Sequence, residues 1–220
     1  MPGRPHTVSD VMTRTVAAIG RDAPFRDVVT LMEEWKVSAL PVLERDGQVI
    51  GVVSEADLLP KEEFRDGDPD RFIQRQRLDD MAKAGAVTAE ELMSTPAVTV
   101  RASATLAQAA RAMARQKVKR LPVVDAEGML EGIVSRSDLL KVFLRGDEEL
   151  AAEVRHEVVD RLFPLSADHI QVEVTDGVVT LTGWVDDEGV AGVAQRLARA
   201  VEGVVDIRCC LVPVSARSDP

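Results

Sequence analysis

Two serine–aspartate pairs have the residue types and spacing that favour ligand chemistry. Ser54 and Asp57 lie in GVVSEADLL, and Ser135 and Asp138 lie in GIVSRSDLL, 81 residues further along the chain. Each serine follows an apolar stretch typical of a strand, and each aspartate comes one helical turn later. This spacing is that of a capping box, in which a hydroxyl and a carboxylate satisfy free backbone amides at a helix start. The simplest interpretation is therefore structural.

The same arrangement also suits a nucleotide. Unpaired amides at a helix amino terminus bind anions, and a serine hydroxyl can join them on a phosphate. A carboxylate has only acceptors, so the aspartate can receive two hydrogen bonds from the vicinal hydroxyls of a ribose. From the residues alone, helix capping and nucleotide binding stay open as alternatives.

Both pairs belong to an internal repeat, and an offset of 81 residues aligns 8–59 with 89–140 without a gap. Met12 then falls on Met93, and Leu40-Pro41-Val42 falls on Leu121-Pro122-Val123. We refer to the two halves as copy one and copy two. A unit of about fifty residues is marginal alone, so we expect the copies to share a core as a pseudo-two-fold pair.

Each copy has the pattern strand, helix, hairpin, helix, with a helical face of period 3.6 and a glycine turn between the hairpin strands. In copy one we expect a strand over 16–19, a helix after Asp22, strands over 39–43 and 49–53 joined at Asp46-Gly47, and a helix from Ser54. In copy two we expect a strand over 98–100, a helix after Ser103, strands over 121–124 and 130–134 joined at Glu127-Gly128, and a helix from Ser135.

Residues 148–214 form a different unit. An apolar stripe from Leu150 to Leu162 predicts a helix that ends at Phe163-Pro164. The segment HIQVEVTDGVVTLTGWV alternates around Asp176-Gly177, which predicts a hairpin, and a helix ending near Gly203 and a last strand follow. The predicted fold class is therefore mixed α+β and α/β, with two β-α-β-β-α units and one small α-β-β-α-β domain.

Two units that each end in Ser-x-x-Asp after a Leu-Pro-Val strand resemble a tandem pair of cystathionine-β-synthase (CBS) domains, a Bateman module. The resemblance covers roughly residues 8–145 and divides them into a CBS domain at 8–60, a linker at 61–87 and a CBS domain at 88–145. It implies a homodimeric sensor that binds an adenosine nucleotide (AMP, ADP or ATP) between the paired units and has no catalytic activity. Some relatives bind S-adenosylmethionine, NADH or metal instead.

The copies differ in charge where a phosphate would lie. Glu55 in copy one corresponds to Arg136 in copy two, and Ser38-Ala39 corresponds to Lys119-Arg120. A phosphate would be repelled by Glu55 and would gain charge-assisted hydrogen bonds from Arg136. We therefore expect the stronger site in copy two.

The CBS resemblance also implies a role for each residue of that site. The implied set is Ser135 and Arg136 for the phosphate, Asp138 for the ribose, and backbone around Thr99, Val118 and Arg120 for the base. The alternative for Arg136 and Lys119 is an ordinary solvated surface charge. Ser54 and Asp57 would form a weaker second site or only cap their helix.

The last unit resembles a BON domain (bacterial OsmY and nodulation) through Val179–Gly183, Val185 and Val201-Glu202-Gly203-Val204. That resemblance implies a phospholipid or membrane-surface partner. The basic residues Arg196, Arg199 and Arg208 are scattered among acids, so a protein partner is an equal alternative. Trp184 could be an exposed anchor or could pack the helix against the sheet.

Composition narrows the function classes further. A net charge of −10 and 3% aromatic residues argue against nucleic-acid partners. Three scattered histidines and the adjacent Cys209 and Cys210 predict no metal or redox site, and no catalytic motif is present, so we expect no enzyme. The amino terminus lacks an apolar signal segment and no apolar run approaches ~20 residues, which predicts a cytoplasmic protein.

Overall fold

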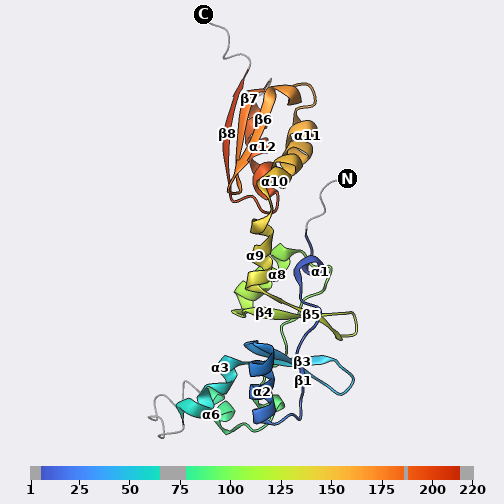
Figure 1. Cartoon of the computed structure of the whole chain (residues 1–220), viewed down its shortest axis with the longest axis vertical. Helices are drawn as coiled ribbons and strands as arrows, with labels where there is room; N and C mark the ends of the chain where they lie inside the picture. Colours follow the sequence, from blue (N-terminus) through green and yellow to red (C-terminus); the bar gives the residue numbers. More distant parts are fainter. Residues whose placement is uncertain (1–5, 65–77, 186–187, 214–220) are drawn as a thin grey trace, which may run out of the picture. The chain divides into compact units, whose positions relative to one another are not determined.

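The computed structural model describes residues 6–64, 78–185 and 188–213 (Figure 1). It divides into two compact units, one spanning residues 7–136 and one formed by His6 with the described residues from Ser137 onward. No helix in the described ranges is long and apolar enough to cross a membrane.

Copy one has the predicted order of elements. They are β1 (Ile19–Gly20), α2 (Phe25–Trp35), β2 (Ala39–Leu43), β3 (Val49–Ser54) and α3 (Glu55–Leu58), with β1 parallel and β3 antiparallel to β2. Val28 and Met32 of α2 are buried against this sheet, as their spacing predicts. The helix does not begin after Asp22: Pro24 is its N-cap, because extended pairing with Thr88 keeps Pro24 out of the helix.

Copy two repeats the arrangement with α8 (Leu106–Gln116), β4 (Arg120–Val124), β5 (Leu130–Ser135) and α9 (Arg136–Leu140). Its first strand is reduced to a bridge between Val100 and Val123. The prediction that Ser103 caps this helix is wrong, because Thr105 is the N-cap of α8. The Thr105 hydroxyl accepts from the Gln108 amide at 3.2 Å, and the Gln108 side-chain carbonyl accepts from the Thr105 amide at 2.9 Å. The capping box at Thr105 is the stronger signal because it satisfies two amides.

The two copies exchange their amino-terminal segments, which carry α1 (Val8–Val11) and α7 (Ala89–Leu92). The amide of Thr13 in copy one donates to the Ile133 carbonyl of copy two at 2.9 Å. The equivalent amide of Ser94 in copy two donates to the Val52 carbonyl of copy one, also at 2.9 Å. The two contacts are equivalent, because Thr13 aligns with Ser94 and Val52 aligns with Ile133 at the offset of 81 residues. This equivalence is expected of a pseudo-two-fold pair.

This exchange explains the repeated glycine before each serine. The Met12 thioether packs on Gly132, where an added methyl group would lie 2.8 Å from Met12 Sδ and 3.0 Å from the Thr13 carbonyl oxygen. Met93 packs on Gly51 in the same way, with its Cγ 2.7 Å from the methyl position. A side chain at either glycine would push the exchanged segment off the sheet.

Two short helices lie in the described part of the segment between the copies. In the first, α4 (Pro60–Glu63), Lys61 Nζ donates to the carbonyls of Ala84 at 3.2 Å and Ala86 at 2.8 Å. These carbonyls lie at the end of α6 (Leu78–Gly85), where a cation is favoured by the helix dipole. The Lys61 ammonium also lies 5.0 Å from the centre of the Phe25 ring, so α6 is fixed to copy one.

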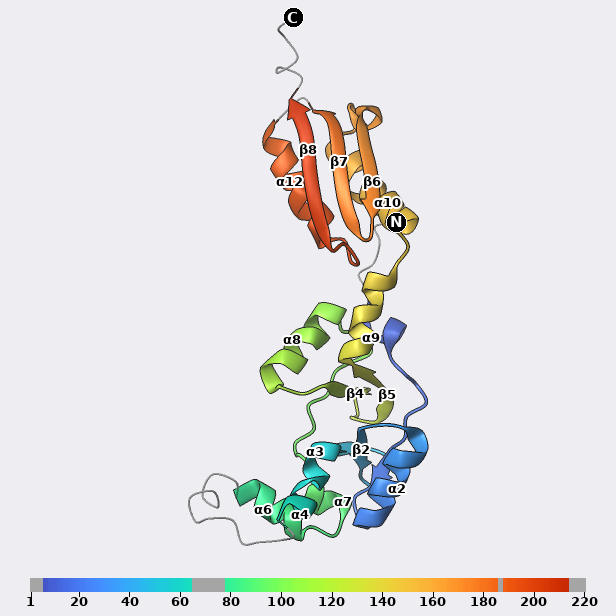
Figure 2. The ribbon, with the colours of Figure 1, turned by 60° about the vertical axis from the view of Figure 1, so that its left-hand side comes forward.

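The carboxy-terminal domain has the predicted helix, two strands, helix and strand. Its elements are the 3-10 helix η1 (Lys141–Leu144), α10 (Asp147–Val154), the π-helical turn η2 (Arg155–Val159), α11 (Asp160–Leu162), the 3-10 helix η3 (Ala167–His169), β6 (Ile170–Thr175), β7 (Val178–Val185), α12 (Glu188–Ala200) and β8 (Asp206–Pro213). β7 is central, antiparallel to β6 and parallel to β8. Figure 2 shows α10 and α12 on one face of this sheet.

The Asp176-Gly177 hairpin is confirmed, with φ of 51° and 73° at the two residues. Positive φ at both central positions matches the right-handed twist of the strands. The Asp147 carboxylate, in the first turn of α10, accepts from the amides of Asp176 at 3.0 Å and Gly177 at 2.9 Å. The turn is therefore held by the helix that precedes it.

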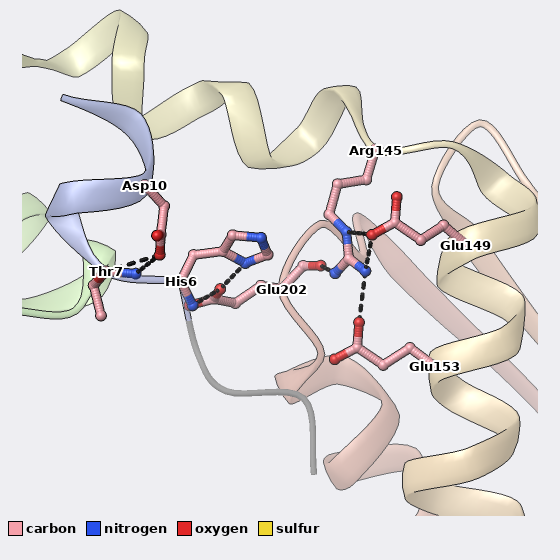
Figure 3. A network of polar contacts seen from close by, with 7 residues as sticks. All are labelled: His6, Thr7, Asp10, Arg145, Glu149, Glu153 and Glu202. Atoms are coloured by element: carbon pink, nitrogen blue, oxygen red, sulfur yellow. Dashed lines mark hydrogen bonds and ion pairs between the residues drawn. The ribbon is translucent and has the colours of Figure 1, made fainter. Parts of the chain in front are cut away.

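Arg145 organises the start of this domain (Figure 3). Its guanidinium donates to Glu149 and Glu153, each at 2.6 Å, and to the Glu202 carbonyl at 2.7 Å. Burial lowers the pKa of Arg145, but its hydrogen bonds to Glu153 and Glu149 outweigh that effect and hold the pKa above its ordinary value. The Glu202 carboxylate in turn accepts from the amide and Nδ1 of His6, each at 2.7 Å.

The sheet face opposite the helices carries Trp184, which is 37% exposed and lies beside Val212 across the β7–β8 pairing. The indole is therefore not part of the domain core, as the exposed-anchor alternative predicts. Cys209 and Cys210 are both free thiols on alternate faces of β8.

Two glycine-to-alanine changes test this domain. Gly183 has φ of 135°, and an added methyl group would overlap the His169 carbonyl oxygen, so Gly183→Ala should cost about 2 kcal/mol or more. Gly192 is exposed within α12 and a methyl group there meets nothing, so Gly192→Ala should stabilise by about 1 kcal/mol. Urea unfolding measures both; equal effects of the two changes would contradict the assigned strand geometry.

Candidate functional site

A cavity of about 270 Å³ lies beside the serine–aspartate pair of copy one, wholly within residues 7–136. Both copies supply its walls. Its lining residues are Ser38, Ala39, Val52, Ser54, Glu55, Ala56, Asp57, Ser94, Pro96, Ala97, Val98, Lys117, Val118, Lys119 and Arg120.

Asp57 is the buried acid of this cavity, only 8% exposed. Its Oδ2 accepts from the Ser54 amide at 2.8 Å and from the Ser54 hydroxyl at 2.6 Å. The hydrogen bond from the amide belongs to the capping box of α3, so Ser54 and Asp57 do cap their helix, and ligand binding by this pair stays a prediction. Its Oδ1 accepts from the Ser94 hydroxyl at 3.4 Å and pairs with the ammonium of Lys83.

Copy two lines the cavity with the turn from α8 into β4, Lys117 to Arg120. Lys117 ends α8 in the left-handed conformation, with φ of 56°. The Arg120 guanidinium donates to the Ser38 hydroxyl of copy one at 2.6 Å. Three cations from copy two therefore line the cavity together with the carboxylates of Glu55 and Asp57, so the cations outnumber the acids and the lining favours an anion.

The structure separates the residues predicted for binding into two groups. Five of them line the cavity: Ser54, Asp57, Val118, Lys119 and Arg120. The other four, Thr99, Ser135, Arg136 and Asp138, do not line it, although Thr99 follows Val98, which does. The cavity therefore combines the serine and aspartate of one copy with the basic residues of the other.

In copy two, the predicted phosphate and ribose contacts are engaged with protein groups. The Arg136 guanidinium donates to the Val118 carbonyl at 3.3 and 3.0 Å, and its amide donates to the Lys119 carbonyl at 3.1 Å. The Asp138 carboxylate pairs with Lys141 at 2.7 Å. Binding at the copy-two residues stays a prediction.

Several lining residues were not predicted from the sequence. They are Ser38, Ala39, Val52, Ala56, Lys117 and the segment around Ser94 and Pro96–Val98. The segment reaches copy one through the exchange, because the bridge between Ser94 and Val52 carries it across. One sequence signal for this segment is the repeated methionine, Met12 in copy one and Met93 in copy two. Each methionine comes one residue before the residue that pairs with the other copy, Thr13 or Ser94. Within the described ranges, no group of three His, Cys, Asp or Glu residues could hold a metal ion.

Comparison with known proteins agrees with this architecture. The CBS-domain profile matches residues 8–61 and 89–145, and the BON-domain profile matches residues 146–211. The chain belongs to the CBS-domain family and carries a BON domain after its CBS pair. The mixed α/β fold predicted from the sequence is thus confirmed.

Relatives of the CBS pair include CBSX2, a chloroplastic CBS-domain protein of Arabidopsis thaliana, which is 32% identical over 155 residues, 64% of this chain and 64% of CBSX2. A crystal structure of CBSX2 in complex with AMP superposes with a TM-score of 0.56 over 63% of this chain and 97% of that one. An uncharacterized protein of Methanocaldococcus jannaschii is 27% identical over 153 residues, 62% of this chain and 90% of that protein.

The capping box of α7, which positions Ser94, gives a pH-dependent prediction. Amide bonds from Val87 at 2.7 Å and Thr88 at 3.2 Å lower the pKa of Glu91 below its ordinary value. The ionised carboxylate is thus favoured by folding, and its contribution is present above the unfolded pKa and lost as pH falls through the folded one.

We therefore expect Glu91→Gln to lower the urea midpoint at pH 7 and to have progressively less effect below about pH 4. A difference between the two proteins that stays constant from pH 7 to pH 3 would show that Glu91 titrates alike in the folded and unfolded chains.

Proposed function

We propose that this protein is a non-catalytic regulatory sensor, cytoplasmic and homodimeric, that binds an adenosine nucleotide (AMP, ADP or ATP) through its CBS pair. The observation that carries the proposal is the cavity that Ser54 and Asp57 line together with Lys117–Arg120. In this proposal the BON domain is the output, and its partner is a protein or phospholipid surface.

The chemistry of the cavity supports a ribonucleotide. Asp57 offers a fixed carboxylate for the ribose hydroxyls, and the cations of Lys117, Lys119 and Arg120 favour phosphate. In the same lining, Val52, Ala97 and Val98 supply small apolar surfaces suited to a base. The AMP complex of CBSX2, a relative whose CBS pair has the same fold, supports the choice of an adenosine ligand.

The cavity favours the copy-one pair over the copy-two pair as the principal site. Within copy one alone, Glu55 would repel a phosphate at the Ser54–Asp57 pair. With the copies paired, Glu55 and Asp57 line the same cavity as three cations, so the formal charge of the lining is positive. The copy-two residues Ser135, Arg136 and Asp138 remain as a proposed second site.

Binding of AMP to matched aspartate variants tests the proposal. Asp57→Asn keeps the shape of the side chain but removes the charge that strengthens the two hydrogen bonds proposed with the ribose hydroxyls. We therefore expect AMP to bind about 10- to 100-fold more weakly, as measured by calorimetry. Asp138→Asn is the matched change in copy two and should leave the principal site intact.

An alternative in which the protein is a docking scaffold without a nucleotide ligand makes the opposite prediction. It expects no heat of binding and no thermal shift with AMP, ADP or ATP at millimolar concentration. Loss of binding in Asp138→Asn but not in Asp57→Asn would instead place the principal site in copy two.

A further inference from the structure

Lys83, on the linker helix α6, pairs with the carboxylate that the proposed ligand needs. Its ammonium contacts Oδ1 of Asp57, and the two side chains are 19% and 12% exposed. Lys83 is not among the residues that line the cavity, although its partner Asp57 is. It also lies 3.4 Å from the Ser94 hydroxyl, which comes from the exchanged segment.

The acceptor capacity of Asp57 is already used. A carboxylate has about four lone-pair positions. Oδ2 accepts hydrogen bonds from the Ser54 amide and hydroxyl, and Oδ1 accepts from the Lys83 ammonium and the Ser94 hydroxyl. Because the Ser54 bonds also cap α3, the bonds on Oδ1 are the ones that a ribose could replace without undoing the helix start.

We propose that Lys83 is a built-in competitor for Asp57, so that a ribonucleotide binds by displacing Lys83 and thereby loosens α6. This inference rests on the proposed function. The vicinal hydroxyls of a ribose can replace the hydrogen bonds of the ammonium. A deoxyribose has one hydroxyl fewer and replaces them poorly. Lys83 thus lowers the affinity for a ribose, which must displace it, and couples occupancy to the linker.

Copy two provides an internal contrast. There the aspartate of the pair, Asp138, binds Lys141, which lies three residues later and has a side chain 56% exposed. Displacing Lys141 would free only a solvated side chain of the same segment. Displacing Lys83, which lies 26 residues after Asp57, would release the linker helix α6.

The loosening of α6 is partial because the helix has a second attachment. Lys61 donates to the carbonyls of Ala84 and Ala86 at the carboxyl end of α6, and no ligand group is proposed to compete with it. Lys61 thereby supplies a matched control: Lys61→Met weakens the attachment of α6 without changing the partners of Asp57.

The test compares AMP with 2′-deoxy-AMP on the full-length wild type, Lys83→Met, Lys83→Gln and Lys61→Met, by calorimetry. We expect Lys83→Met to bind AMP at least about fivefold more tightly than the wild type, and the ratio of AMP to 2′-deoxy-AMP affinity to rise by a similar factor. The AMP affinity of Lys83→Gln should lie between those of the wild type and Lys83→Met. Lys83→Gln replaces Lys83→Met in the comparison if Lys83→Met folds poorly. Lys61→Met should keep the wild-type ratio.

Hydrogen exchange of residues 80–85 gives a second readout that a purely structural lysine would not change. In the wild type, saturating AMP should accelerate exchange in α6, and 2′-deoxy-AMP should do so much less. In Lys83→Met, exchange should already be fast and should respond little to AMP.

The outcomes separate the two proposals. Unchanged or weaker AMP binding in Lys83→Met, with binding intact in the wild type, would overturn the competitor role and leave the nucleotide site standing. The same change of ratio in Lys61→Met would also overturn it. AMP binding by Lys83→Met but not by the wild type would support the competitor role and contradict the proposal that the wild-type protein senses AMP. Failure of every variant to bind would remove the nucleotide site and the competitor role together.

Discussion

The exchange of amino-terminal segments between the two CBS copies is the constraint on which the site depends. Met12 can reach Gly132, and Met93 can reach Gly51, only because neither glycine has a side chain. Each segment then pairs with the last hairpin strand of the other copy, through Thr13 and Ser94. The hydrophobic core of copy one consequently includes Ala89 and Leu92, so copy one is not complete alone.

A site built in this way is composite. The aspartate and its capping serine come from the end of one sheet, and the cations come from the helix end of the other copy. Asp57 has two structural tasks, since it caps α3 through Ser54 and pairs with Lys83 of the linker helix. A buried carboxylate that already holds two elements together is well placed to report a ligand, because any new partner changes what it holds.

Local signals in the sequence predicted most of the fold. The 81-residue repeat, the period of each helix and the Asp176-Gly177 turn identified the elements within a few residues. The helix starts were misplaced at Asp22 and Ser103, because pairing with Thr88 and the capping box of Thr105 depend on neighbours outside the local pattern. The charge of the site could not be predicted from either copy alone, because residues of both copies line the cavity. The pairing of Lys83 with Asp57 was not predictable either, because Lys83 belongs to no repeated or periodic pattern in the sequence.

The most direct test of the composite site is a crystal structure of the protein grown with AMP. The account predicts ribose hydroxyls within hydrogen-bond distance of Asp57, phosphate on the side of Lys117 to Arg120, and Lys83 withdrawn from the carboxylate. AMP bound elsewhere on the protein, or an Asp57–Lys83 pair that persists beside a bound ribose, would contradict it.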